Sequence, residues 1–124
     1  MPGTGRRPAD VTLPTVRVTG RGEVPASAKE YAVRKVSDVP SFTREPVLAL
    51  HVVLALAADP ARRLRASAEA SLDLNGRPIH VQVEAEHLTE AIDLLVDRLR
   101  RRLVDSEDRH RSRRRDPGPD PQDG

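Results

Sequence analysis

The segment Leu64–Ala85, LRASAEASLDLNGRPIHVQVEA, decides the fold of this 124-residue chain. Apolar and polar side chains alternate on both sides of Asn75-Gly76, as is typical of strands with one buried and one solvent-facing side. Asn-Gly tolerates the positive φ angles of a type I′ turn, so the segment predicts a β-hairpin. The side chains expected to face the core are Leu64, Ala66, Ala68, Ala70, Leu72 and Leu74, then Ile79, Val81, Val83 and Ala85.

Two more strands are predicted before the hairpin. Thr15–Thr19 (TVRVT) alternates and is rich in β-branched residues, which favours a short strand. Val47–Leu56 is a nearly continuous apolar run, which suits a central strand and ends before Asp59-Pro60. Its expected core residues are Leu48, Leu50, Val52, Leu54 and Leu56.

Two amphipathic helices complete the folded region. The first follows Pro25, a favourable first-turn residue, and is expected to end at Pro40. Its apolar stripe is Ala28, Tyr31, Ala32, Val36 and Val39. The last helix follows the hairpin, and its apolar stripe is Leu88, Ala91, Ile92, Leu95, Leu99 and Leu103.

The order β-α-β-β-β-α predicts an α+β fold, a two-layer sandwich of one four-stranded mixed sheet with both helices on one face. The first helix can join the first two strands in parallel, whereas hairpins make the other pairs antiparallel. We expect a single folded domain over residues 15–109. Residues 1–14 are expected to form a disordered tail, and residues 110–124 a basic and then Pro-rich linker or tail.

Positive charge is concentrated at the end of the last helix. Residues 98–115 include nine arginines and three acidic residues, whereas the rest of the chain has twelve basic and sixteen acidic residues. Such a charge distribution favours binding of a polyanion at one end of the molecule, and a phosphate backbone is the obvious candidate.

The arginines of the last helix are the candidate binding residues. At about 100° per residue, Arg101 points away from the core, and Arg98, Arg102 and Arg109 share a flank beside it, whereas Arg100 lies on the opposite flank. Guanidinium groups in such a ladder can each contact a phosphate. A charge-rich helix face can also be merely solvated. The run Arg100-Arg101-Arg102 and the cations of the first helix favour a binding patch. The further candidates are Lys29, Arg34 and Lys35 on the first helix and Arg111, Arg113, Arg114 and Arg115 in a tail beyond the last helix.

Other classes of function find little support. The four histidines lie on separate elements without metal-ligand spacing, no cysteine is present, and no catalytic triad or Gly-rich phosphate loop stands out. We therefore expect no enzyme activity, no metal and no cofactor. No stretch approaches the ~20 apolar residues that span a bilayer, and residues 1–14 lack the apolar core of a signal peptide, so we expect a cytoplasmic protein without membrane contact.

Several motifs resemble the ribosome hibernation-promoting factor family, also called protein Y, ribosome-associated inhibitor or the sigma-54 modulation protein family. They are Val18-Thr19-Gly20-Arg21, Lys29-Glu30-Tyr31, Leu74-Asn75-Gly76, Ala91-Ile92-Asp93 and Asp97-Arg98-Leu99. The similarity covers about residues 15–113. It implies a β-α-β-β-β-α domain similar to double-stranded-RNA-binding domains, in agreement with the order above.

The resemblance also implies a partner and a role. Family members bind 16S rRNA of the small ribosomal subunit in the decoding channel, where mRNA and A- and P-site tRNA would sit. In the 70S ribosome this inhibits translation and protects idle ribosomes during stress or stationary phase. By position, Lys35, Arg98, Arg101 and Arg109 match basic family positions. Long members add a C-terminal dimerisation domain through a flexible linker, and this sequence stops within a segment that resembles that linker. It is therefore either an excised N-terminal domain or a short natural form. In either case we expect the chain to be monomeric and not to pair ribosomes, with dimerisation only if the parent protein has a C-terminal domain.

Two departures and two alternatives accompany the resemblance. Val104–Asp108 is acidic where family members continue basic residues, and the first helix ends early, at Pro40. The alternatives are a regulatory protein-interaction module that modulates a sigma factor, and a generic double-stranded-RNA-binding domain.

Overall fold

The computed structural model describes residues 15–115, apart from the side chains of residues 15, 108 and 110–115. Its elements are β2 (Thr15–Arg21), α1 (Ala26–Val36), the 3₁₀ helix η2 (Val39–Phe42), β3 (Val47–Leu56), β4 (Ala66–Leu74), β5 (Arg77–Ala85) and α2 (Leu88–Arg115). This order confirms the predicted β-α-β-β-β-α fold.

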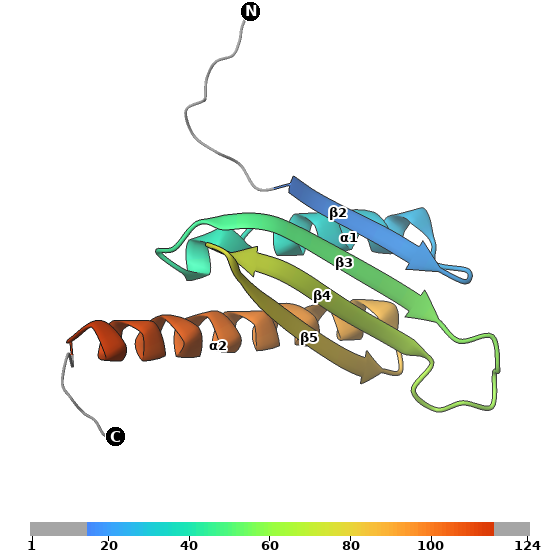
Figure 1. Cartoon of the computed structure of the whole chain (residues 1–124). Coiled ribbons are helices and arrows are strands. Elements are labelled where there is room, and N and C mark those ends of the chain that lie inside the picture. The colour runs from blue at the N-terminus through green and yellow to red at the C-terminus, as the bar shows by residue number, and fades with distance from the viewer. Residues whose placement is uncertain (1–14, 116–124) are drawn as a thin grey trace, which may run out of the picture.

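The four strands form one mixed sheet in the order β2-β3-β4-β5. β2 pairs with β3 in parallel, and the two remaining pairs are antiparallel. Both helices lie on the same face of the sheet, α1 behind β2 and β3 and α2 behind β4 and β5 (Figure 1). The opposite face is left open, as the alternation of the hairpin predicts.

The hairpin forms in the predicted register. Asn75 and Gly76 both have positive φ angles, 53° and 92°, and the Asp73 carboxylate accepts a hydrogen bond of 2.7 Å from the Gly76 backbone N–H. Because the side-chain period of a strand is two, this turn fixes which residues face the helices. Ala66, Ala68, Ala70, Leu72 and Leu74 are buried, as are Ile79, Val81, Val83 and Ala85.

The helix α2 packs on the sheet through its predicted stripe. Ala91, Ile92, Leu95, Leu99 and Leu103 are all fully buried. Burying a Leu or Ile side chain stabilises a fold by about 1.5–3 kcal/mol, so this stripe holds α2 firmly against β4 and β5.

Three predictions about local structure are wrong. Leu48 is 43% exposed, because the β3–β4 pairing shifts register between Val47 and Ala49 and turns Val47 into the core instead. Leu64 precedes β4 and is 39% exposed. α1 ends at Val36 rather than Pro40, and Pro40 belongs to η2, where it occupies a first-turn position that needs no N–H.

Within residues 15–115, no helix is both long and apolar enough to cross a membrane.

Candidate nucleic-acid interface

The three predicted cations of α1 are all exposed, but they point to different neighbours. Arg34 and Lys35 flank the Tyr31 ring, at 5.7 and 5.8 Å from its centroid. Lys29 extends over Gly20 of β2, where an added Cβ atom would lie 3.1 Å from Lys29 Cε. Lys29 therefore lies beside the edge strand β2 and does not join the cations near α2.

A hydrogen bond locks α1 to α2 at the centre of this region. The Tyr31 hydroxyl donates to Asp93 Oδ1 at 2.6 Å, and the same oxygen lies 3.7 Å from Lys35 Nζ. The hydrogen bond to Asp93 is the main cause that raises the pKa of Tyr31 above its ordinary value of 10.0, followed by desolvation and the negative charge of Asp93. Asp93 thus fixes the position of α1 and partly neutralises Lys35.

A groove of about 330 Å³ runs between α1, η2 and α2. It is lined by Lys35, Asp38, Phe42, Asp93, Val96, Asp97 and Arg100. The Arg100 guanidinium lies 5.6 Å from the Phe42 ring centroid, a cation–π contact that holds it over the groove. We call Lys35 and Arg100 the groove cations. Both have acidic neighbours, because Asp93 and Asp97 line the same groove.

Arg100 is a residue that the sequence reasoning missed. Its position on the flank opposite Arg98 and Arg102 follows from helical periodicity, but periodicity does not say which flank faces α1. The structure shows that the flank of Arg100 does, so Lys35 of α1 lies beside Arg100 and not beside the predicted ladder.

The other flank of α2 faces the edge strand β5. Arg102 Nη1 donates to the His80 carbonyl of β5 at 3.0 Å. Arg98 lines a depression of about 380 Å³ together with Gln82, Val83, Glu84 and Leu94, and it forms no ion pair within residues 15–115. We call Arg98 and Arg102 the edge arginines. The two residues lie on the same flank of α2, as predicted, but Arg102 also donates a hydrogen bond to a backbone carbonyl.

Arg101 points outward between the two flanks. Its Nη2 atom lies 3.0 Å from Asp97 Oδ2 one turn earlier, and its side chain remains 73% exposed. Exposed pairs of this kind are worth about 0.3–0.5 kcal/mol, so the contact leaves Arg101 available for a stronger anion. Arg109 is exposed further along the helix.

The sequence predicts that the basic segment after Arg109 lies beyond the end of the last helix. This prediction is wrong. α2 runs to Arg115, so the backbone of these residues forms its last turns. The side chains of Arg111, Arg113, Arg114 and Arg115 lie outside the described part of the structure.

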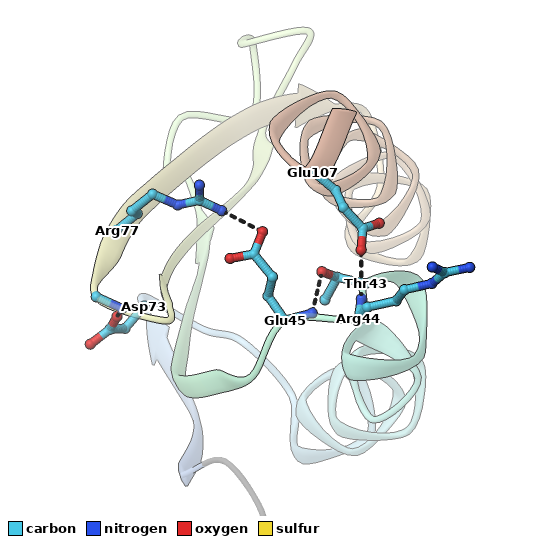
Figure 2. Close-up of polar contacts among 7 residues, drawn as sticks. Thr43, Arg44, Glu45, Asp73, Arg77 and Glu107 are labelled. Carbon is cyan, nitrogen blue, oxygen red and sulfur yellow. Dashed lines mark hydrogen bonds and ion pairs between the residues drawn. The ribbon is translucent and has the colours of Figure 1, made fainter. Parts of the chain in front are cut away.

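The acidic stretch of α2 has a structural role at Glu107. Its Oε2 atom accepts a hydrogen bond of 3.1 Å from the Arg44 backbone N–H, which anchors α2 to the loop before β3 (Figure 2). The same loop is held on its other side by Glu45, which pairs with Arg77 of the hairpin at 2.8 Å (Figure 2). The exposed side chain of Arg44 is thereby placed near η2 and α2. No sequence pattern marks Arg44, because it lies in a loop without periodicity.

Comparison with known proteins places this arrangement in a family. The family model described as "Sigma 54 modulation protein / S30EA ribosomal protein" matches residues 16–111. The chain belongs to this family. The resemblance to the hibernation-promoting factors is therefore confirmed, and the chain is a member of a family of ribosome-associated proteins.

Two solved structures share the fold. The N-terminal domain of Protein Y from Thermus thermophilus superposes with a TM-score of 0.60 at 27% identity, covering 76% of this chain and 99% of that domain. A ribosomal subunit interface protein from Coxiella burnetii also has a TM-score of 0.60, at 18% identity, covering 74% of this chain and 96% of that one. Among curated proteins, none matches this sequence.

Proposed function

We propose that this chain binds 16S rRNA of the small ribosomal subunit in the decoding channel, at the positions of mRNA and of A- and P-site tRNA. In the 70S ribosome it would inhibit translation and protect idle ribosomes under stress, as a cytoplasmic binding factor without catalytic activity. We also propose that it acts as a monomer and does not pair ribosomes.

The observation that carries this proposal is the family match over residues 16–111. Two similar solved proteins bear the names Protein Y and ribosomal subunit interface protein, and the Thermus domain is covered almost completely. These names support a ribosomal partner for this chain as well.

The geometry supports binding of folded RNA through its phosphates. The edge arginines, Arg101 and the groove cations all lie on α2 or beside it. Guanidinium groups form paired hydrogen bonds with phosphate oxygens, and folded RNA is recognised mostly through its shape and backbone. Lys29 and Arg34 are weaker candidates, since neither lines the groove.

Sedimentation of ribosomes with the added chain tests this function. We expect it to co-sediment with the small subunit and the 70S ribosome, to produce no ribosome dimers, and to be displaced by mRNA with initiator tRNA. Failure of mRNA and tRNA to compete would contradict binding in the decoding channel. Competition by an unrelated RNA duplex to the same extent would instead indicate a generic double-stranded-RNA-binding domain.

A regulatory protein-interaction module is the second candidate, because the family description includes modulation of sigma 54. The salt dependence of binding separates the two. With roughly four to six phosphate contacts, affinity for the ribosome should fall by orders of magnitude between about 50 and 200 mM salt. A weak salt dependence would favour the protein-interaction module.

A further inference from the structure

The open face of the sheet carries a row of polar side chains that crosses all four strands. Arg17 of β2 pairs in register with His51 of β3, which pairs with Ser71 of β4, which pairs with His80 of β5. Residues directly opposite one another on neighbouring strands point to the same side, about 4.8 Å apart. These four side chains therefore form one line of hydrogen-bonding groups on the face that the helices leave uncovered.

A shallow depression of about 420 Å³ lies along this row. Arg17, His51, Ser71 and His80 all line it, Ala49 and Pro78 give it an apolar margin, and Asp73 lines its end near the hairpin turn, away from β2. The His51 ring is held in place, because its Nε2 atom lies 3.0 Å from Thr19 Oγ1. The depression thus combines a guanidinium, an oriented imidazole and a hydroxyl from three neighbouring strands.

The acidic residues of this face are already engaged. Glu69 pairs with His80 at 2.8 Å, Glu84 pairs with Arg62 at 3.3 Å, and Asp73 accepts the Gly76 N–H. All three lie on β4 and β5.

The β2 side of the sheet is positive by contrast. β2 carries Arg17 and Arg21 and no acidic residue, and within residues 15–115 neither arginine forms an ion pair or a side-chain hydrogen bond. The available positive charge of the open face is therefore gathered along β2.

We propose that Arg17, His51 and Ser71 form a second phosphate-binding site, which takes the backbone of an RNA strand that runs along β2 and continues past Arg21. This goes beyond the proposed function, which places the RNA contacts on the two helices. The site contacts phosphate rather than bases, because Tyr31 and Phe42, the only Phe, Tyr or Trp residues of the chain, lie on α1 and η2 on the other side of the sheet. With the site occupied, the domain lies between two RNA segments, one on each face.

Nuclear magnetic resonance of the full 124-residue chain tests the site directly. The probe is a twelve-nucleotide oligouridylate, with inorganic phosphate as a separate arm. We expect the oligonucleotide to shift the side-chain signals of Arg17 and His51 and the backbone signal of Ser71. Shifts confined to α1 and α2 would overturn the proposal. Equally strong shifts with inorganic phosphate alone would overturn the assignment to an RNA backbone.

A matched pair of variants measures the contribution of the site. Arg17→Gln removes one charge from it, whereas Arg63→Gln removes one charge from the exposed loop before β4, where Arg63 pairs with Glu86. We expect Arg17→Gln to lower the affinity for oligouridylate roughly fivefold and to reduce the slope of log affinity against log salt by about 0.7, one phosphate contact with a single strand. Equal effects of the two variants, with both folded by circular dichroism, would overturn the proposal.

The site and the proposed function can fail separately. If wild-type chain binds ribosomes but oligouridylate leaves Arg17, His51 and Ser71 unchanged, the sheet site is wrong and the function stands. If oligouridylate shifts these residues but the chain does not bind ribosomes, the site stands and the decoding-channel function is wrong.

Discussion

The two flanks of α2 both carry positive charge, but they differ in what surrounds it. On the flank facing β5, Arg98 forms no ion pair within residues 15–115, since Glu84, the carboxylate of its depression, pairs with Arg62, and Arg102 contacts a backbone carbonyl. On the flank facing α1, the groove cations Lys35 and Arg100 share their groove with carboxylates. A cation beside a carboxylate attracts a phosphate less strongly, because the negative charge of the carboxylate lowers the positive potential around the cation.

This difference shows that the number of basic residues on a surface does not by itself determine how strongly that surface binds an anion. Asp93 in the groove joins the two helices through Tyr31, and it also lies beside Lys35. A carboxylate that stabilises the fold thus lowers the positive potential on this flank. We expect the flank of the edge arginines, with Arg101, to contribute more to RNA affinity.

Reversing charge on the edge flank should have the largest effect. Arg98→Glu with Arg101→Glu should lower affinity for the small subunit on the order of a hundredfold, since two phosphate contacts become repulsions. Arg102 is left intact because it also supports β5. The matched control is Arg62→Glu with Arg63→Glu, the same change of charge in the loop before β4. Binding by filtration or co-sedimentation measures both, and retained affinity in the first variant would remove this flank from the interface.

Reversing the groove cations should have a smaller effect. For Lys35→Glu with Arg100→Glu we expect a loss of roughly tenfold in the same assay, because acidic neighbours already offset these charges. A loss as large as that of the edge-flank variant would mean that the groove carboxylates do not weaken the groove cations, and the contrast between the flanks would be wrong.

The anchor of α2 to the loop before β3 can be tested by stability. Glu107→Ala removes the acceptor of the Arg44 N–H and should lower the free energy of unfolding by about 1 kcal/mol. Asp105→Ala, an exposed carboxylate two residues earlier, is the control and should have little effect. Urea denaturation measures both, and equal losses would indicate a general effect of charge rather than an anchor.

Removing the charge of Asp93 should strengthen RNA binding slightly. Asp93→Asn keeps an oxygen that can accept from Tyr31 and removes the negative charge beside Lys35. We expect affinity for the small subunit to rise roughly twofold to threefold, the gain expected from relieving one exposed ion pair. Glu23→Gln in the β2–α1 loop is the control, and a similar gain there would attribute the effect to net charge alone.

The smallest expected effect concerns pH and Tyr31. Because the hydrogen bond to Asp93 raises the pKa of Tyr31 in the folded state, its contribution to stability is fully present below the unfolded value near 10 and is lost as pH rises through the folded pKa. Wild-type protein should therefore be slightly more stable than Tyr31→Phe at about pH 8, and the difference should shrink as the pH rises above about 10. Urea denaturation of both proteins over this pH series checks this, and a difference that stays constant with pH would assign it to another cause.

Much of the fold could be predicted because its signals are local. The alternation around Asn75-Gly76 and the apolar stripe of the last helix predicted the strands, the turn and the buried residues correctly, apart from the exposed Leu64 and the half-buried Leu88. Local patterns failed where a tertiary contact overrides them. Leu48 continues the alternation of β3, but the register shift turns Val47 inward instead.

The candidate interface was predictable only in part. Helical spacing grouped Arg98 with Arg102 and left Arg101 facing outward, and the structure agrees on both points. It did not reveal that Arg100 lies beside Lys35 or that Arg44 lies near α2, because their placement depends on contacts with Phe42 and Glu107 from distant parts of the chain.

The sequence by itself determined the elements, their order, the open face of the sheet and the family, since periodicity, turn chemistry and short motifs are carried by neighbouring residues. Only the tertiary structure decided which flank of α2 meets α1 and that Asp93 joins the helices. It also decided that Arg17, His51 and Ser71 line up across three strands. The physical reason is that these contacts join residues 20 to 62 positions apart, whose packing and strand register no local pattern specifies.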